Sequence, residues 1–285
     1  MRTALVFGGS GQIGVAVIER LCEAGWNVTA VSRTAHANGE RLAWLRGDLQ
    51  QSQALPAQVD AIFSLGPLDH FSRWYAATPL VSPRVVAFGS TSLEAKQDSG
   101  DADERDLAHR LRAAEALVFE TASGRGSAAT VLRPTLVYGA GRDKTLTRIA
   151  QLARRTGCFV LPRTANGLRQ PVHVMDLADA ALAVVDMAAT HGRSYALPGG
   201  ETLRYSEMVK RTLRSLQPPA RLIRVPPLLF KTALAGAHAV GKLRGLGDAA
   251  LTRMADDLVF DVALARQDFG YSPRRFEPEA RMFSS

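Results

Sequence analysis

Residues 3–24 read TALVFGGSGQIGVAVIERLCEA, and this stretch decides the fold. The apolar run Thr3–Phe7 predicts a buried strand, and the apolar residues at helical spacing in Ile13–Ala24 predict a helix. Three glycines, at positions 8, 11 and 14, separate the strand from the helix. A glycine-rich turn with a strand before it and a helix after it predicts a binding site for the phosphates of a dinucleotide.

Each of the three glycines has its own physical reason. Gly8 permits the tight turn, Gly11 lets the backbone approach a pyrophosphate, and Gly14 lets the helix pack closely on the strand. The N–H groups at the start of the helix, together with the helix dipole, favour negative phosphate groups. Gln12 and Ile13 lie in the same first turn, so we assign all five residues to a candidate cofactor site.

The chain then alternates short apolar runs with helical stretches. The runs are bounded by Gly, Pro or Asp, as buried parallel strands are. The predicted strands are Asn27–Ser32, Leu42–Arg46, Ala61–Leu65, Arg84–Phe88 and Thr130–Tyr138; the predicted helices include Asp103–Ala122, Lys144–Thr156, Asp176–Ala189 and Ser206–Leu216. Strand–helix alternation of this kind predicts an α/β fold built on a Rossmann-type, doubly wound parallel sheet.

The composition bears on several classes of protein. The chain has 285 residues and a net charge of +8, but its basic residues are scattered and no nucleic-acid motif is present, so we expect no nucleic-acid partner. No apolar run reaches the length of a membrane span and no leader precedes the first strand, so we expect a cytoplasmic protein. Two cysteines, Cys22 and Cys158, are too few for a disulfide framework or a cysteine metal cluster, and we expect no metal.

The spacing Gly-x-x-Gly-x-x-Gly resembles that of the short-chain dehydrogenase/reductase superfamily. The resemblance is strongest to its extended and atypical branches, which are related to nucleotide-sugar epimerases and dehydratases. It covers nearly the whole chain, because further motifs of the family follow in the family's order. They are Gly47-Asp48-Leu49, RPTLVYG at 133–139, QPVHVMDLA at 170–178, and the tail from Phe260 to Pro273.

The resemblance implies a division of the chain into two parts. Residues 1–138 and 170–198 would form the Rossmann core that binds NAD(P), and residues 139–169 and 199–285 a smaller α/β lobe that binds a small-molecule substrate. Substrate would lie between core and lobe, over the carboxyl ends of the strands. A homodimer is an expectation by analogy of fold alone.

The resemblance also assigns individual residues of the core to parts of the cofactor. Asp48 and Leu49 would contact the adenine. Leu65 and Gly66 would pass beneath the ribose, and Pro134 and Leu136 would approach the nicotinamide.

The choice of cofactor follows from the end of the second strand, which reads Val31-Ser32-Arg33-Thr34. An acidic residue there would bind the ribose hydroxyls of NAD and repel a 2′-phosphate. No carboxylate is present, whereas Arg33 can pair with the 2′-phosphate and Ser32 can donate a hydrogen bond to it. We therefore predict NADP, with NAD as an alternative if Arg33 is only a solvated residue that stacks on the adenine.

The catalytic pair that the family usually carries is missing. In enzymes that this chain resembles, Tyr-x-x-x-Lys lies on the helix after the fifth strand, where the tyrosine moves the proton and the lysine lowers its pKa. Glu115 resembles the glutamate that lies four residues after that lysine. Counting back from Glu115 places Leu111 at the position of the lysine and Leu107 at the position of the tyrosine. Thr91 stands where the family has a Ser or Thr that hydrogen-bonds the substrate oxygen; a turn-forming hydroxyl is the alternative.

Three interpretations of the missing pair stay open. His109, on the same helix, has a suitable side chain for proton transfer, although it can equally lie on a solvated face. Solvent or substrate can supply the proton instead. Finally, the fold can be kept for binding alone, as in a catalytically silent NADP-binding sensor or scaffold. The leading interpretation is an NADP-dependent oxidoreductase or epimerase/dehydratase-like enzyme acting on a small carbonyl or hydroxyl compound or a nucleotide-sugar.

Three further residues are candidates for substrate binding. Arg142 follows Tyr138-Gly139-Ala140-Gly141, which resembles a stretch that runs over the substrate mouth in the family. Arg169 and His173 flank the segment where the chain returns to the core. Positive charge there would suit an anionic substrate. The alternatives are a solvated loop for Arg142 and a core position for His173.

Overall fold

The computed structural model of the chain describes residues 1–50, 55–230, 232 and 248–284. The chain forms two compact units. The first unit comprises Met1–Thr135, Val174–Leu197 and Asp261–Ser272; the second comprises Leu136–His173, Pro198–Phe260 and Pro273–Ser285. Within the described residues, no helix combines the length and the apolar character that crossing a membrane requires.

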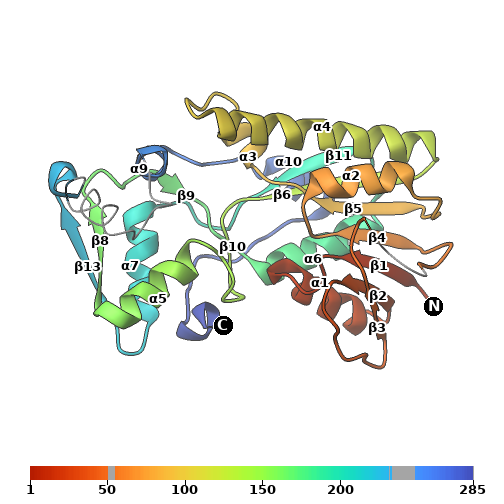
Figure 1. The fold of residues 1–285 in the computed structure, drawn as a ribbon, viewed down its shortest axis with the longest axis horizontal. Helices are drawn as coiled ribbons and strands as arrows, with labels where there is room; N and C mark the ends of the chain where they lie inside the picture. Colours follow the sequence, from red (N-terminus) through yellow and green to blue (C-terminus); the bar gives the residue numbers. More distant parts are fainter. Residues whose placement is uncertain (51–54, 231, 233–247, 285) are drawn as a thin grey trace. The chain divides into compact units, whose positions relative to one another are not determined.

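The first unit is built on a sheet of seven parallel strands (Figure 1). In spatial order the strands are β11 (Arg193–Leu197), β6 (Ala128–Pro134), β5 (Arg84–Phe88), β4 (Ala61–Ser64), β1 (Thr3–Phe7), β2 (Asn27–Ser32) and β3 (Leu42–Arg46). The chain order reverses on the two sides of β1, so the sheet has its topological switch point between β1 and β4. The predicted Rossmann-type fold is confirmed.

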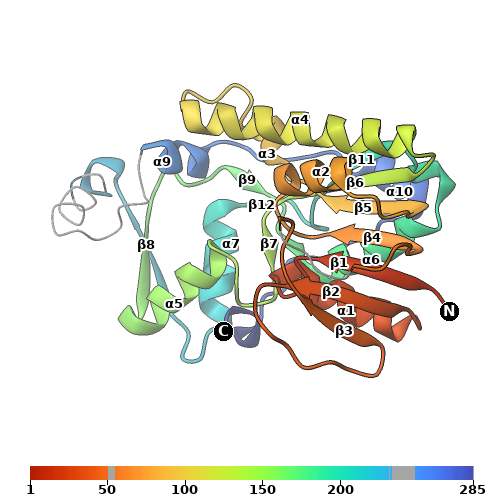
Figure 2. The same cartoon turned by 45° about the vertical axis from the view of Figure 1, so that its right-hand side comes forward.

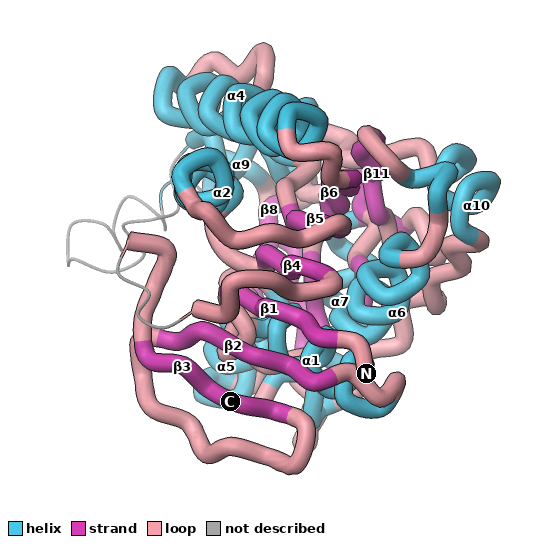
Figure 3. The backbone as a smooth tube through the Cα atoms, turned by 90° about the vertical axis from the view of Figure 1, so that its right-hand side faces the viewer, coloured by secondary structure: helices cyan, strands magenta, loops and turns pink. Residues whose placement is uncertain are grey.

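Helices cover both faces of this sheet (Figure 3). On one face lie α2 (Leu68–Ala77) and the long α4 (Ala102–Gly124), which pack against each other. The other face carries α1 (Gln12–Glu23) and α6 (Val174–Val185), which also pack together. The short α3 (Ser92–Ala95), η1 (Ala188–Thr190) and α10 (Ala263–Phe269) complete the unit.

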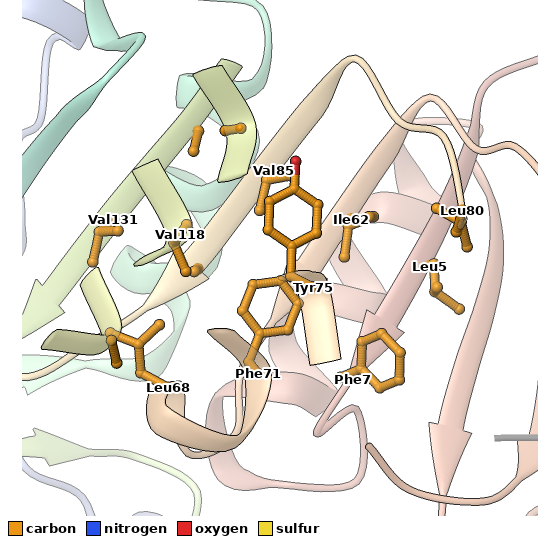
Figure 4. Close-up of a cluster of buried hydrophobic side chains, with 14 of the residues drawn as sticks. Leu5, Phe7, Ile62, Leu68, Phe71, Tyr75, Leu80, Val85, Val118 and Val131 are labelled. Atoms are coloured by element: carbon orange, nitrogen blue, oxygen red, sulfur yellow. The ribbon is translucent and has the colours of Figure 1, made fainter. Parts of the chain in front are cut away.

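The core between the sheet and the α2/α4 layer consists of buried aliphatic and aromatic side chains (Figure 4). Side chains at every second position of β1, β4 and β5 point to this face, as the pleat requires. Leu5, Ile62 and Val85 are fully buried there, opposite Phe71 and Tyr75 of α2, whose rings stack with centroids 5.8 Å apart. This packing fixes α2 on the sheet and, with it, the ends of β1 and β4.

The described part of the second unit contains the helices α5 (Leu146–Thr156), α7 (Tyr205–Ser215) and α9 (Asp248–Ala255), the short η2 (Ala280–Phe283) and three pairs of short strands. The helices α5 and α7 lie side by side (Figures 1 and 2). The strand pairs are β7 (Val137–Tyr138) with β10 (Val172–His173), β9 (Leu168–Arg169) with β12 (Leu203–Arg204), and β8 (Cys158–Pro162) with β13 (Arg221–Val225). The single strand predicted over 130–138 is therefore two strands, β6 and β7, which belong to different units.

The end of the chain is part of the second unit's core. Phe276 and Phe283 are almost completely buried, and Phe283 is the last residue of η2 (Ala280–Phe283). The Arg154 guanidinium of α5 donates to the main-chain oxygens of Phe283 at 2.6 Å and Ala280 at 2.9 Å. The helix α9 (Asp248–Ala255) also belongs to this unit.

Candidate cofactor and active site

The turn between β1 and α1 has the backbone that only glycine can supply. Gly8 has a φ of +75°, and a Cβ there would lie 2.8 Å from the carbonyl carbon of Leu65. At Gly14 a Cβ would lie 2.2 Å from the Gly8 carbonyl oxygen and 2.6 Å from that of Gly9. The turn is closed by the Gly11 amide, which donates to the Gly8 oxygen at 2.9 Å. The end of β1 and the start of α1 are thus in backbone contact, with no room for a side chain at Gly14.

The start of α1 offers hydrogen-bond donors rather than acceptors. The first four N–H groups of a helix have no partner within the helix, and the N-cap residue here, Gly11, has no side chain with which to cap them. Its first turn carries no acidic residue, so the positive end of the helix dipole is not neutralised locally. A Cβ on Gly11 would meet only the Gly8 oxygen, at 3.1 Å, which leaves space in front of the turn.

One buried polar atom at this turn is unsatisfied. Among the described residues, nothing donates a hydrogen bond to the buried side-chain oxygen of Gln12. Buried polar groups normally have a partner in the protein or in a bound molecule. The donors at the helix start, the space in front of Gly11 and this acceptor together fit a diphosphate with neighbouring hydroxyl groups, as a dinucleotide has.

The predicted ribose and adenine residues lie at the carboxyl ends of the neighbouring strands. Leu65 follows β4, donates from its amide to the Phe7 oxygen at 2.9 Å, and lies directly against Gly8. A Cβ on Gly66 would meet nothing within 4 Å. Asp48 follows β3, where its carboxylate accepts from the Gln50 amide at 2.8 Å. Leu65 and Gly66 therefore lie at the carboxyl end of β4, beside the switch point, whereas Asp48 lies at the carboxyl end of the edge strand β3.

At the end of β2, Ser32 is buried and Arg33 is exposed. The Ser32 hydroxyl accepts from the Thr34 amide at 3.2 Å, which shapes the turn that carries Arg33. The strand end holds no carboxylate, as the sequence indicated. Arg33 therefore has no acidic residue beside it within Val31–Thr34.

Thr91 lies beyond the end of β5, next to the end of β6. It is 7% exposed, and its hydroxyl donates to the Pro134 carbonyl oxygen at 3.1 Å. The structure thus brings together Thr91 and Pro134, two residues that the sequence assigned to the substrate oxygen and the nicotinamide. Both belong to the first unit.

The positions of the missing catalytic pair lie on α4. Leu107 and Leu111 are half-buried, and His109, between them in sequence, is exposed. Successive helical positions differ by about 100° around the axis, since a turn takes about 3.6 residues, so His109 leaves α4 in a different direction from both leucines. Its neighbour Arg110 pairs with Asp106 at 2.8 Å.

An ion-pair network that sequence reasoning missed supports the Thr91 segment. Arg133 of β6 forms a bidentate pair with Glu115 of α4, at 2.9 and 2.5 Å, and binds Glu94 of α3 at 2.8 Å. Glu115 is 5% exposed. Burial acts to lower the pKa of Arg133, but hydrogen bonds and charge from the two carboxylates outweigh it and raise that pKa. Gly89 makes room for the network, because a Cβ there would lie 2.9 Å from the Glu115 carboxylate.

The candidate substrate residues of the second unit differ in what they contact. His173 is buried under Gly139, which has a φ of +111° and where a Cβ would lie 2.5 Å from Nε2. The His173 ring meets Tyr138 edge to face, with centroids 5.1 Å apart. Leu136 packs on the core of this unit, and its carbonyl accepts from the Val172 amide at 2.9 Å. Arg142 is exposed.

Arg169 is buried, and its donors are directed at main-chain oxygens. Its guanidinium binds the carbonyls of Leu168 and Asp256, each at 2.7 Å, and also that of Arg253 at the end of α9. Burial lowers the pKa of Arg169. The guanidinium also lies over the Tyr205 ring, 5.4 Å from its centroid. The side chain thus caps a helix end, a contact that the sequence gave no means to foresee.

A glycine turn that offers helix-terminal N–H groups, at the switch point of a doubly wound parallel sheet, defines a dinucleotide-binding Rossmann protein. The model of the NAD dependent epimerase/dehydratase family matches residues 4–82 and 82–197. The chain belongs to this family. The resemblance inferred from the glycine spacing and the later motifs is confirmed.

Two curated proteins illustrate the range of relatives. The 2-alkyl-3-oxoalkanoate reductase of Stenotrophomonas maltophilia (strain K279a) is 28% identical, over 95% of this chain and 94% of its own length. The UDP-glucose 4-epimerase of Vibrio cholerae is 22% identical, over 62% of this chain and 52% of its own length. The family and these relatives place the chain among NAD(P)-dependent oxidoreductases and epimerase-like enzymes of the short-chain type.

Solved structures agree on the fold. The epimerase Mth375 of Methanothermobacter thermautotrophicus matches with a TM-score of 0.72 at 14% identity, covering 99% of this chain and 91% of that one. MoeE5, solved with UDP-glucuronic acid and NAD, also matches with a TM-score of 0.72, at 19% identity, covering 99% and 97% of the two chains. At these identities the likeness concerns the fold, and residue roles must come from the chain itself.

Proposed function

We propose that the chain is an NADP-dependent oxidoreductase that interconverts a carbonyl and a hydroxyl group on a small molecule. The observation that carries the proposal is the combination of a glycine N-cap at the start of α1 with Arg33, instead of an acidic residue, at the end of β2. The first favours a pyrophosphate, and the second favours the additional 2′-phosphate that distinguishes NADP from NAD. A family relative that matches nearly the whole chain and is named as a reductase supports the direction of the chemistry.

Specific residues would hold the cofactor, all of them in the first unit except Leu136, which is the first residue of the second unit. The N–H groups of Gln12, Ile13 and Gly14 would bind the pyrophosphate, and Ser32 and Arg33 the 2′-phosphate. Asp48 and Leu49 would contact the adenine, and Leu65 and Gly66 the ribose. Pro134 and Leu136 would approach the nicotinamide. When bound, the cofactor supplies or takes the hydride, and the protein supplies position and a path for one proton.

Thr91 would bind the reacting oxygen of the substrate. Its hydroxyl proton is directed at the Pro134 carbonyl, so its oxygen can accept a hydrogen bond from a substrate hydroxyl. In the direction of carbonyl reduction, the hydroxyl must turn away from Pro134 and donate to the substrate carbonyl oxygen. The proton that completes the alcohol would come from His109 or from water, because Leu107 and Leu111 have none to give.

We assign substrate binding to the second unit, with the exposed Arg142 as the main candidate for an anionic group; His173 is buried against Gly139 and Tyr138 and would have to become accessible to take part. Arg169 would have to leave its three carbonyl partners to take part. A cytoplasmic location and a homodimer stay predictions from the sequence. Light scattering distinguishes a single chain of 30.7 kDa from two.

The test of catalysis is turnover of NADPH with a panel of 3-oxo acids, simple ketones and nucleotide-sugars. Thr91→Ala should lower kcat/KM on an accepted substrate by about 10-fold or more, since it removes a hydrogen bond to the reacting oxygen. NADPH affinity should change less than about two-fold, since Thr91 contacts no part of the predicted phosphate sites. Ser92→Ala, which removes a neighbouring hydroxyl, is the matched control. Equal kcat/KM for Thr91→Ala and wild type would refute the role of Thr91.

The cofactor preference has its own test in Arg33→Asp. This change replaces a partner of the 2′-phosphate with the residue type that binds the ribose hydroxyls of NAD. We expect the dissociation constant for NADPH to rise about 30-fold, which is the scale of one charge-assisted hydrogen-bond pair. The dissociation constant for NADH should stay the same or fall. Arg73→Asp, on the exposed side of α2, controls for the change in net charge. Wild-type protein that binds NADH more tightly than NADPH would contradict the preference.

One observation favours a second function, an NADP-binding sensor or scaffold. The positions of the family's tyrosine and lysine carry the half-buried apolar residues Leu107 and Leu111. Tight NADPH binding without turnover of any compound in the panel would favour this alternative over the enzyme.

A further inference from the structure

A polar cluster that the sequence analysis did not single out lies at the end of β2. The His36 Nε2 atom is 3.0 Å from the Ser32 hydroxyl and 3.1 Å from the Thr34 hydroxyl. The two hydroxyl oxygens are 3.2 Å from each other. Three side chains from the strand end and the following loop therefore converge on one point. The loop passes outside β3 (Figure 3), where exposed chain connects β2 to β3.

Trp44 of β3 holds the imidazole in place. The two rings stack with centroids 4.3 Å apart and planes inclined by 33°. The far edge of the Trp44 indole reaches the glycine turn, because a Cβ on Gly9 would lie 3.3 Å from it. His36 is thus joined through one rigid side chain to the turn that is proposed to hold the pyrophosphate.

Two arginines neighbour Ser32, one along the chain and one across the sheet. Arg33 lies between Ser32 and Thr34 in the chain, and Arg46 of β3 is the register partner of Ser32 in β2. Paired residues of parallel strands point to the same face of a sheet, so the Arg46 side chain leaves the sheet on the same face as the Ser32 hydroxyl. Both arginines are exposed. Hydroxyls, an imidazole and guanidinium groups form the donor set that a phosphate monoester requires.

We infer that His36 is a specificity-determining residue for the cofactor: with the hydroxyls of Ser32 and Thr34 it receives the 2′-phosphate of NADP. The inference rests on the proposed NADP preference and adds to Arg33 a residue from the loop. In the structure the three groups hydrogen-bond one another. Phosphate oxygens only accept hydrogen bonds, so a phosphate can accept from all three groups at once. A single ribose hydroxyl, as NAD has there, cannot accept from all three.

The test uses two probes that differ by one phosphate group. Adenosine 2′,5′-bisphosphate and adenosine 5′-monophosphate are titrated into the full chain by calorimetry, and binding is followed in parallel by tryptophan fluorescence, since Trp44 stacks on His36. Wild type should prefer the bisphosphate by about 30-fold or more, and His36→Ala should weaken the bisphosphate about 10-fold. Monophosphate affinity should change less than about two-fold. His191→Ala, an exposed histidine between η1 and β11, is the matched control.

The outcomes separate this inference from the proposal beneath it. If wild type does not distinguish the two probes, the NADP preference fails and the inference fails with it. If wild type prefers the bisphosphate and Arg33→Ala removes that preference while His36→Ala leaves it intact, only the role of His36 is overturned. Thr34→Val, which removes one hydrogen-bonding group of the cluster and leaves the His36 and Trp44 side chains in place, should also weaken the bisphosphate selectively. If His36→Ala and Thr34→Val have the same melting temperature as wild type, their effect is on binding and not on folding.

Discussion

Gly14→Ala is expected to abolish cofactor binding and to lower the stability of the first unit. The new Cβ would lie 2.2 Å from the Gly8 oxygen and 2.6 Å from the Gly9 oxygen, both of them backbone atoms with no freedom to turn aside. The start of α1 must therefore move away from β1, at a cost of about 1–3 kcal/mol in the free energy of unfolding. Displaced N–H groups lose their charge-assisted hydrogen bonds to the pyrophosphate, which should weaken NADPH binding at least about 100-fold.

Two further glycine variants keep this prediction testable if Gly14→Ala does not fold. Gly11→Ala places a Cβ 3.1 Å from a single oxygen and otherwise in open space, so the fold should persist while the methyl group stands where the pyrophosphate would lie. Gly124→Ala at the end of α4 adds the same methyl group with nothing within 4 Å, and should bind NADPH like wild type. Wild-type affinity in both Gly11→Ala and Gly14→Ala would show that the cofactor does not use this turn.

Arg133→Ala should be the most destabilising change outside the glycine turn. It leaves the Glu115 carboxylate, which is 5% exposed, without the guanidinium that it binds at 2.5 and 2.9 Å. Removing one partner of a buried pair costs about 3–5 kcal/mol, because the other charge is left buried and uncompensated. A loss of that size lowers the melting temperature by roughly 10 °C in a protein of this length, as scanning calorimetry would measure.

The double variant Arg133→Met with Glu115→Leu is the control for this prediction. With both charges replaced by apolar groups, no buried charge is left unpaired, and the cost should fall well below that of Arg133→Ala alone. Because the pair also holds the segment that carries Thr91, turnover should fall in both variants. A melting temperature for Arg133→Ala within about 2 °C of wild type would contradict the assigned burial and pairing.

Elements of the fold that depend on neighbouring residues in the chain could be predicted from the sequence. The strand, turn and helix at residues 3–24 follow from apolar periodicity and glycine placement, which need no distant partner. The edges of α4 and α5 also lie within two residues of expectation. By contrast, the predicted strand over 130–138 is broken between Pro134 and Val137, because proline provides no N–H for the ladder and the chain there passes from one unit to the other.

The rest depends on contacts between residues far apart in the chain. Two-residue strands such as β9 and β12 have no periodicity to detect, and their pairing joins positions 168–169 with 203–204. Arg133 and Glu115 were each visible as parts of motifs, but their pairing with Glu94 needs the geometry of β6, α4 and α3. The His36 cluster is equally hidden, because a loop residue gains its neighbours only when Trp44 stacks on it.

The most direct measurement is a crystal structure of the chain grown with NADPH. The account predicts pyrophosphate oxygens within hydrogen-bond distance of the amides of Gln12 and Ile13, in front of Gly11, and a 2′-phosphate between Arg33 and His36. A cofactor bound elsewhere on the chain, or crystals grown at millimolar NADPH with nothing at the turn between β1 and α1, would contradict it.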